Sequence, residues 1–376
     1  MKKTSRREFV MTASAATLTA AASQGRAASP RQRVFVASNS PDGILAYDWN
    51  PATADLTPAG VAAVIDNADW VALSPNREYV FAACELNTFQ GKPTGEIASF
   101  RLRGGKLTQL TARNSAGTGT CHCTIDQTGH VLIAADYFGG SAASFLINDG
   151  KLSQIVWKEH YTKHGPDPVR QPTAHAHFAS ISPNNRFAYI NDLGGDCIHI
   201  YHLNTTTGIL TPAGTYTTKP GFGPRTLHFH PNGHTAYSMN EMAAVVDVLH
   251  WDHTTGMLTL VNRIDLLPSD YKGVGAGCDT VITRDGRFVY FTNREHSFIY
   301  GFKASFTSGA LTPIGRFDAG GRLPRNFVLD PTERWMLVAN QAESHINIYA
   351  RDPETGRLSE TGKSVAAATP MCILFA

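Results

Sequence analysis

The chain of 376 residues has few cysteines, few charged side chains and no sustained helical pattern. Its six cysteines show no framework spacing. Cys121 and Cys123 stand two apart on one predicted strand and face the same side, so they cannot form an ordinary disulfide. We therefore expect all six cysteines to be buried thiols. No segment repeats apolar residues with the period of a helix, which favours an all-β chain.

Several sequence motifs of common enzyme classes are also missing. The chain has no glycine-rich phosphate loop, no Gly-x-Ser-x-Gly elbow and no Cys-x-x-Cys-His haem motif. Charged residues make up 17% and apolar residues 42%, which excludes a disordered chain. The formal charge is +2, and the first 27 residues contribute +4, so the remainder carries −2. That balance argues against a nucleic-acid-binding surface, which needs a basic stripe.

The first 27 residues have the features of an export signal. Residues 5–10, Ser-Arg-Arg-Glu-Phe-Val, form a twin-arginine motif, and a mildly apolar Ala/Thr-rich stretch follows up to Ala22. That stretch is too short and too polar to span a membrane. We expect cleavage near Ala27 and export of the folded protein by the twin-arginine translocase, to the periplasm or outside the cell.

A unit of about fifty residues then recurs six times, as is typical of a β-propeller. Each unit begins with a strand, a Pro/Asn/Gly-rich turn and a second strand. The turns lie at residues 74–76, 126–129, 182–184, 230–233, 283–286 and 330–332. Their second residues are 47 to 56 residues apart.

Two incomplete pieces predict how the ring closes. Residues 34–37 begin as a second strand that lacks a first, and residues 371–376 end as a first strand that lacks a second. Pairing them makes a seventh blade and leaves no exposed sheet edge. The sequence therefore predicts a seven-bladed β-propeller of four-stranded antiparallel blades, one domain over residues 32–376.

Ionisable residues gather where the paired strands begin and end. Positions equidistant from a hairpin turn return to the same end of the hairpin. The positions six before and ten after each turn should therefore meet on one rim. Six before are Asp69, Cys121, His177, Arg225, Cys278 and Arg325, and ten after are Glu85, Tyr137, Leu193, Glu241, Arg294 and Gln341.

Arg225, in Gly-Pro-Arg at 223–225, and Glu241 form the clearest pair on this rim. Arginine offers planar donors for a carboxylate, a phosphate or a developing oxyanion, and a glutamate nearby could act as general base. The same pair could instead only brace two blades. Arg325, in Pro-Arg-Asn at 324–326, follows a proline in the same way and is a second arginine on this rim.

Histidines and one further carboxylate complete the candidate site. His175 and His177 share a face and could chelate a metal with His122, but His177 as acid/base with His175 as support is the stronger interpretation. Arg294 is a further candidate, and Asp279 could orient it.

Additional motifs occur in order along the chain. They are Cys-His at 121–122, Asp-Tyr-Phe-Gly-Gly-Ser at 136–141, Arg-Gln at 170–171, His-Ala-His at 175–177, Asn-Asp-Leu-Gly at 191–194, Phe-His-Pro-Asn-Gly at 229–233, Asn-Glu at 240–241, Asn-Arg at 293–294, Pro-Arg-Asn-Phe at 324–327 and Ala-Asn-Gln at 339–341. With them the chain resembles the seven-bladed β-propeller lactonases, which include propeller-type 6-phosphogluconolactonases and a fungal carboxy-muconate cyclase. The sequence departs from that family at Thr226 and at 279–281 (Asp-Thr-Val).

The resemblance implies a catalytic set of His177, Arg225 and Glu241. His175, Arg325, Arg294, His122 and Asp279 are the expected substrate-binding residues. We expect hydrolysis of a sugar-acid lactone, without metal or cofactor, on an anionic small molecule. Export favours unphosphorylated aldonolactones over the 6-phosphate. A carboxy-muconate-type cycloisomerase and a non-catalytic binding propeller remain the alternatives.

Overall fold

The computed structural model describes residues 32–268 and 270–376. The expected signal at residues 1–27 lies outside the described part. Every regular element is a strand, and the described residues contain no helix long and apolar enough to cross a membrane.

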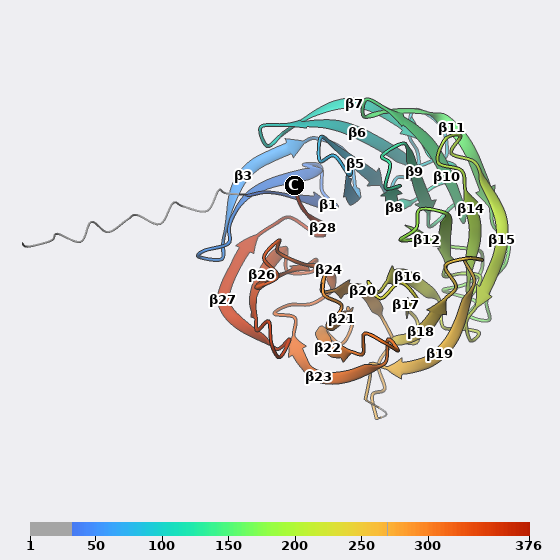
Figure 1. The fold of residues 1–376 in the computed structure, drawn as a ribbon. Coiled ribbons are helices and arrows are strands. Elements are labelled where there is room, and N and C mark those ends of the chain that lie inside the picture. Colours follow the sequence, from blue (N-terminus) through green and yellow to red (C-terminus); the bar gives the residue numbers. More distant parts are fainter. Residues whose placement is uncertain (1–31, 269) are drawn as a thin grey trace, which may run out of the picture.

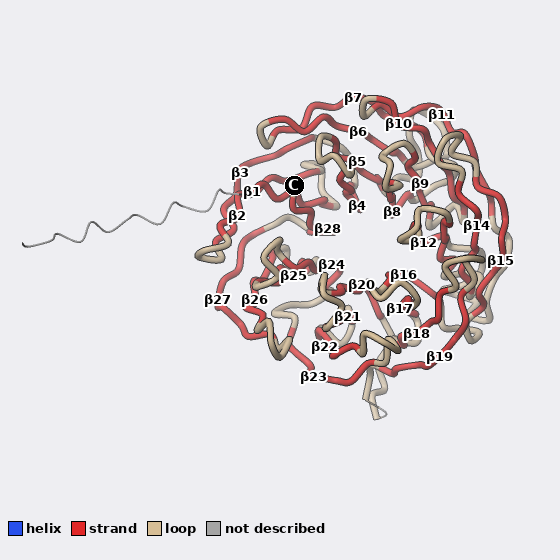
Figure 2. Tube along the Cα trace, viewed as in Figure 1, coloured by secondary structure: helices blue, strands red, loops and turns tan. Residues whose placement is uncertain are grey.

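The 28 strands fall into seven sheets of four, which form a ring (Figures 1 and 2). They are β1 (Gln32–Ser38), β2 (Ile44–Asn50), β3 (Asp55–Ala63), β4 (Ala68–Leu73), β5 (Tyr79–Cys84), β6 (Glu96–Arg103), β7 (Lys106–Asn114), β8 (Thr120–Ile125), β9 (Val131–Asp136), β10 (Ser141–Asn148), β11 (Lys151–His160), β12 (Ala176–Ile181), β13 (Phe187–Asp192), β14 (Cys197–Leu203), β15 (Leu210–Thr217), β16 (Pro224–Phe229), β17 (Thr235–Asn240), β18 (Val245–Trp251), β19 (Leu258–Asp265), β20 (Gly277–Ile282), β21 (Phe288–Asn293), β22 (Phe298–Ala304), β23 (Leu311–Asp318), β24 (Pro324–Leu329), β25 (Trp335–Asn340), β26 (His345–Arg351), β27 (Leu358–Ala366) and β28 (Pro370–Phe375).

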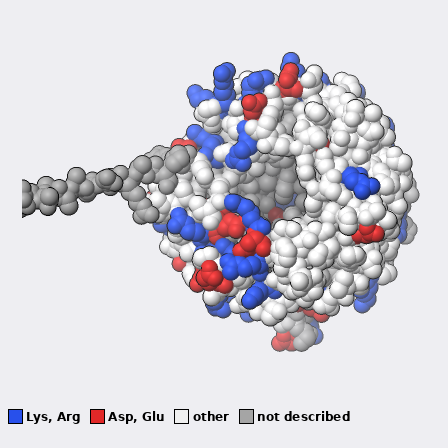
Figure 3. All heavy atoms as spheres, viewed as in Figure 1, with Lys and Arg blue, Asp and Glu red and all other residues white. Residues whose placement is uncertain are grey.

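Each blade is an antiparallel meander whose first strand lies innermost. Blades two to seven run in chain order, from β4–β7 to β24–β27. Blade one has the order β28-β1-β2-β3, so its inner strand comes from the C-terminal end of the described chain. The predicted seven-bladed propeller is confirmed. Figure 3 shows one face of the ring, hollowed at its centre, with charged side chains of both signs gathered over β24 and β26.

Large apolar side chains fill the spaces between neighbouring blades. One such cluster joins Tyr237 and Met239 of blade five to Val289 and Phe291 of blade six. The same alternation runs along every second strand, because one set of side chains faces each neighbouring blade. All six cysteines are free and buried, as expected.

The closing blade is packed like the continuous ones. β28 pairs with β1 so that Ile373 lies opposite Val36, and both are buried in a cluster shared with blade seven. The backbone N–H of Ile373 also donates to the side chain of Asn326 at 2.9 Å. The ring is therefore tied at its seam by a sheet, an apolar cluster and a cross-blade hydrogen bond.

Replacing Ile373 by valine tests whether this seam folds with the rest of the ring. Removing one methylene from a packed core typically costs about 0.5–1.5 kcal/mol. We expect Ile373→Val and Ile190→Val, which is equally buried in β13, to lower the free energy of unfolding by similar amounts. Urea denaturation measures both. A seam variant without effect beside a destabilised Ile190→Val would show that blade one opens before the ring unfolds.

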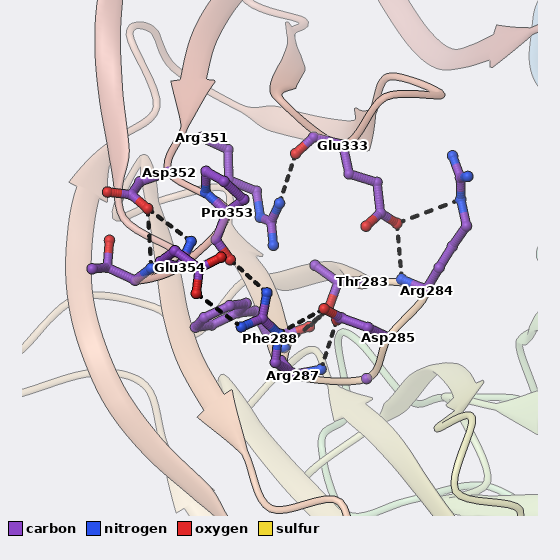
Figure 4. Close-up of polar contacts among 12 residues, drawn as sticks. Thr283, Arg284, Asp285, Arg287, Phe288, Glu333, Arg351, Asp352, Pro353 and Glu354 are labelled. Atoms are coloured by element: carbon purple, nitrogen blue, oxygen red, sulfur yellow. Dashed lines mark hydrogen bonds and ion pairs between the residues drawn. The ribbon is translucent and has the colours of Figure 1, made fainter.

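Polar contacts link blades six and seven at their β-turns, away from the rim described below (Figure 4). The backbone N–H of Arg284 donates to Glu333 Oε1 at 2.8 Å, and the Arg287 guanidinium donates to the Pro353 carbonyl at 2.8 Å. Within blade seven, the buried Arg351 donates to the carbonyl of Glu333 at 2.7 Å. Because Arg284 and Arg287 are exposed, we assign the contacts between the two blades a bracing role of small energy.

Candidate active site

A β-bulge interrupts each inner strand at the same position. In β16, Pro224 pairs with Asn240 and Thr226 with Met239, so Arg225 has no partner in the ladder. A bulge re-aims the side chain of its extra residue. The bulge residues of the seven blades are Met371, Asp69, Cys121, His177, Arg225, Cys278 (with Asp279) and Arg325. All seven positions line one small space of about 20 Å³ at the centre of the ring.

A larger cavity of about 310 Å³ opens beside this ring of bulges. Eight of its lining residues are ionisable groups that the sequence placed on the rim: Glu85, Cys121, Tyr137, His177, Arg225, Glu241, Arg294 and Arg325. Arg170 and the loop at 274–276 complete most of the wall. The rim predicted from hairpin register is therefore a real cavity in the described structure.

Arg225 joins the two other members of the expected catalytic set. Its Nη1 donates to Glu241 Oε2 at 2.5 Å and also contacts His177 Nε2. All three side chains are more than nine-tenths buried. The structure thus brings His177, Arg225 and Glu241 together on three neighbouring segments of blades four and five.

Local backbone geometry explains why Arg225 and Glu241 lie side by side. Gly223 adopts a left-handed conformation with φ of 63° and accepts a hydrogen bond from the Glu241 backbone N–H at 2.7 Å. A β-carbon at Gly223 would come within 3.0 Å of Leu193 and Met242. Two features therefore require glycine at position 223: the positive φ angle and the lack of room for a side chain.

Three arginines surround the carboxylate of Glu241. Arg225 contacts Oε2, while Arg294 at 2.8 Å and Arg170 contact Oε1. Burial opposes ionisation of this carboxyl, but the arginines, Arg294 foremost, hold its pKa well below the usual value. Glu241 is therefore ionised at neutral pH and has no proton to give. Its position suits an orienting role for the guanidinium groups better than that of a base.

His177 is neutral in this setting. Burial, followed by the charge of Arg225, keeps its pKa well below the ordinary value. Arginine has no acceptor atom, so the Nε2 that contacts Arg225 must be the unprotonated nitrogen. The single lone pair of His177 Nε2 therefore accepts from the Arg225 guanidinium in this structure. It can take a proton from water once a bound substrate draws Arg225 away from it.

His175 supports the wall without lining the cavity. Its ring stacks on Tyr137 at a centroid distance of 4.4 Å, and its Nδ1 contacts the Tyr137 carbonyl at 2.9 Å. Tyr137 also packs edge-on against His177, at 5.3 Å. His175 thus holds Tyr137 in place against His177.

The opposite wall carries a second charged group. Arg325 Nη2 lies 3.0 Å from Asp69 Oδ1 and 4.0 Å from Glu85 Oε2. Asp69 and Arg325 are bulge residues, and Glu85 follows β5 immediately. Arg325 therefore lines the central space together with Arg225 and has two carboxyl groups of its own.

His122 and Asp279 border the small central space but do not line the larger cavity. His122 packs between Trp70 and Phe178, and it also lines a separate hollow toward the ends of the inner strands. The expected support of Arg294 by Asp279 is wrong: a bulge of two residues turns Asp279 toward Asn326, whose amide donates to it at 2.8 Å. Arg294 bonds to Glu241 instead.

The metal alternative also finds no support at this rim. Among residues 32–268 and 270–376, the group of His, Cys, Asp or Glu side chains close enough to hold an ion is Asp192, Cys197 and His199. It includes none of His122, His175 and His177.

Among the cavity residues that the predicted site omitted, three bear on its chemistry: Tyr137, Glu85 and Arg170. Tyr137 and Glu85 occupy rim positions of the hairpin register, so the signal for them was present. Arg170 lies in the long loop between β11 and β12, where no register applies. Its place beside Glu241 follows only from the folded path of that loop.

Comparison with known proteins gives consistent matches over this fold. A model of the family described as "Lactonase, 7-bladed beta-propeller" matches residues 33–375. A 6-phosphogluconolactonase of Bacillus subtilis is 31% identical over 89% of this chain and 94% of its own length. One from Formosa agariphila is 32% identical over 85% and 91%. The solved structure of a periplasmic gluconolactonase from Pseudomonas aeruginosa has a TM-score of 0.87 and 26% identity, and covers 92% of this chain and 99% of that one.

Proposed function

From the premise that this chain belongs to the seven-bladed β-propeller lactonases and is a lactone-hydrolysing carboxylic-ester hydrolase, we propose that its substrates are sugar-acid lactones. The observation that carries the proposal is the contact of Arg225 with both His177 Nε2 and Glu241 in the 310 Å³ cavity. A proton acceptor and an oxyanion donor then meet at one point. That combination is what ester hydrolysis by water requires.

The chemistry follows from the protonation states. Water attacks the lactone carbonyl carbon while His177 Nε2 takes its proton, a contribution of about 10²–10⁴-fold for a well-placed base. The negative charge that develops on the carbonyl oxygen is stabilised by Arg225. Glu241 keeps Arg225, Arg294 and Arg170 in place, and these guanidinium groups need no reorganisation during the reaction.

The four guanidinium groups of the cavity already contact Glu241 or Asp69, so none is reserved for a phosphate. Two of the four arginines, Arg225 and Arg294, are engaged by Glu241 and shielded from solvent. Arg170 has the most exposed guanidinium of the set, but it too contacts Glu241. The expected export by the twin-arginine route would deliver the enzyme to the periplasm, where the Pseudomonas aeruginosa relative is named a gluconolactonase. We therefore propose an unphosphorylated aldonolactone as the preferred substrate.

A comparison of two lactones tests this preference. We expect kcat/KM for glucono-δ-lactone to exceed that for its 6-phosphate by at least about tenfold, the equivalent of 1.4 kcal/mol. Proton release measured with a pH indicator, corrected for spontaneous opening in a protein-free blank, gives both values. A ratio reversed in favour of the phosphate would assign the enzyme to the phosphorylated substrate, and hydrolysis of neither would contradict the sugar-acid proposal.

A further inference from the structure

Two carboxyl groups share one guanidinium on the wall opposite Arg225. Asp69 and Glu85 both approach the same nitrogen, Arg325 Nη2, at 3.0 Å and 4.0 Å. Asp69 takes the shorter contact, and its side chain is almost fully buried, at 6% exposure. A single cation compensates one buried carboxylate, so a second one beside it is left without a counter-charge.

Glu85 is the member of the pair that can reach a substrate. Its side chain retains 20% exposure and lines the 310 Å³ cavity together with His177 and Arg225, whereas Asp69 lines only the small central space. Burial, followed by the charge of Asp69, raises the pKa of Glu85 to about 8, although Arg325 and Arg225 act against this. The thiol of Cys121 is the other titratable group facing it, and burial keeps that thiol protonated by raising its pKa.

A carboxyl group that is still protonated at neutral pH can donate a proton, and the leaving group of a lactone needs one. When the bond between the acyl carbon and the ring oxygen breaks, the ring oxygen leaves as a strongly basic alkoxide. Glu241 cannot protonate it, because three arginines keep that carboxyl ionised. His177, once it holds the proton taken from water, is the other candidate donor, and the Glu85 variant described below separates the two.

We propose that Glu85 is the general acid of the reaction and that Asp69 and Arg325 position it. This inference rests on the proposed lactone hydrolysis. Water adds to the carbonyl carbon and gives its proton to His177. The ring oxygen then takes the electron pair of the breaking C–O bond and the proton of Glu85. The hydroxy acid leaves, and the proton on His177 restores Glu85 through solvent, with net release of one proton from the carboxylic acid formed.

The dependence on leaving-group basicity separates this role from a structural one. With glucono-δ-lactone, whose leaving group is an alkoxide, we expect Glu85→Gln to lower kcat by about 10²–10³-fold. With dihydrocoumarin, whose leaving group is a much less basic phenolate, the loss should be less than about tenfold. In the wild type kcat should fall as the pH rises past about 8, and this limb should vanish in the variant. Glu354→Gln, an exposed glutamate at the turns, is the matched control.

Equal losses with both lactones, or no loss with either, would overturn the assignment. The wild type failing with both lactones would instead contradict the proposed function itself. An infrared titration then tests the protonation state of Glu85 without measuring activity. We expect a carbonyl band of a protonated carboxyl to disappear with a midpoint near pH 8 in the wild type and to be missing in Glu85→Gln. The band of Glu96, whose pKa burial raises to about 7, should remain in both proteins. A wild-type spectrum that matches the spectrum of Glu85→Gln throughout this pH range would overturn the proposal.

Discussion

Replacing Arg225 with alanine is expected to lower kcat for lactone hydrolysis by about 10²–10³-fold, the usual effect of removing one oxyanion donor. The loss should exceed that value if the proton acceptor is displaced as well, because Arg225 contacts His177 Nε2. The fold should survive, since Glu241 keeps Arg294 and Arg170 as partners. Initial rates of proton release with glucono-δ-lactone measure the effect, and near-ultraviolet circular dichroism checks the fold.

A lysine at the same position should rescue little of this activity. Lysine carries a compact charge on a flexible stem, which does not fix a donor at the point where Arg225 Nη1 contacts both His177 and Glu241. Arg284→Ala, at an exposed arginine of the turn face, serves as the control and should retain full activity. An Arg225→Ala protein with more than half of the wild-type kcat would remove Arg225 from the reaction.

Changing Glu241 to glutamine is expected to reduce both stability and activity. The substitution leaves three arginine cations around a neutral amide in a buried site. Breaking a buried ion pair by removing one partner typically costs about 3–5 kcal/mol of unfolding free energy. The kcat should fall at least about tenfold, because Arg225 and Arg294 lose the group that orients them. Urea denaturation at pH 7 and initial rates measure the two effects.

The pH dependence of stability gives this prediction a sign. The pKa of Glu241 is depressed in the folded protein, so its contribution is present above the pKa of an unfolded glutamate, about 4.3, and is lost as the pH falls through the lower folded value. The wild type should therefore lose stability between about pH 5 and pH 3 more steeply than Glu241→Gln. Glu360→Gln, at an exposed position of β27, should follow the wild type. Parallel curves for the wild type and Glu241→Gln would contradict the depressed pKa.

The architecture was open to prediction because it repeats. Six turns about fifty residues apart indicate six blades, and the half-blades at the two ends supply the seventh, as the pairing of β28 with β1 confirms. Hairpin geometry also places His177, Arg225, Glu241, Arg294 and Arg325 at the same end of the ring. Those inferences need only strand length and turn position, both of which local sequence determines.

Contacts that depend on bulges and loops could not be predicted in this way. Register alone puts Asp279 one position past Cys278, but a two-residue bulge turns its carboxylate toward Asn326. Arg170 reaches Glu241 from a loop whose path no periodic pattern describes. Protonation states also depend on the assembled surroundings. From the sequence, Glu241 is a candidate general base. Only the folded structure shows that three arginines contact it and keep it ionised, which suits a role in orienting them.

The most direct test of the account is the rate of proton release when purified protein meets glucono-δ-lactone at neutral pH. The same measurement is made in a protein-free blank and with Arg225→Ala at equal concentration. We predict a rate well above the blank for the wild type and a rate close to the blank for the variant. A wild-type rate equal to the blank, or a variant as fast as the wild type, would contradict the claim that this cavity hydrolyses sugar-acid lactones.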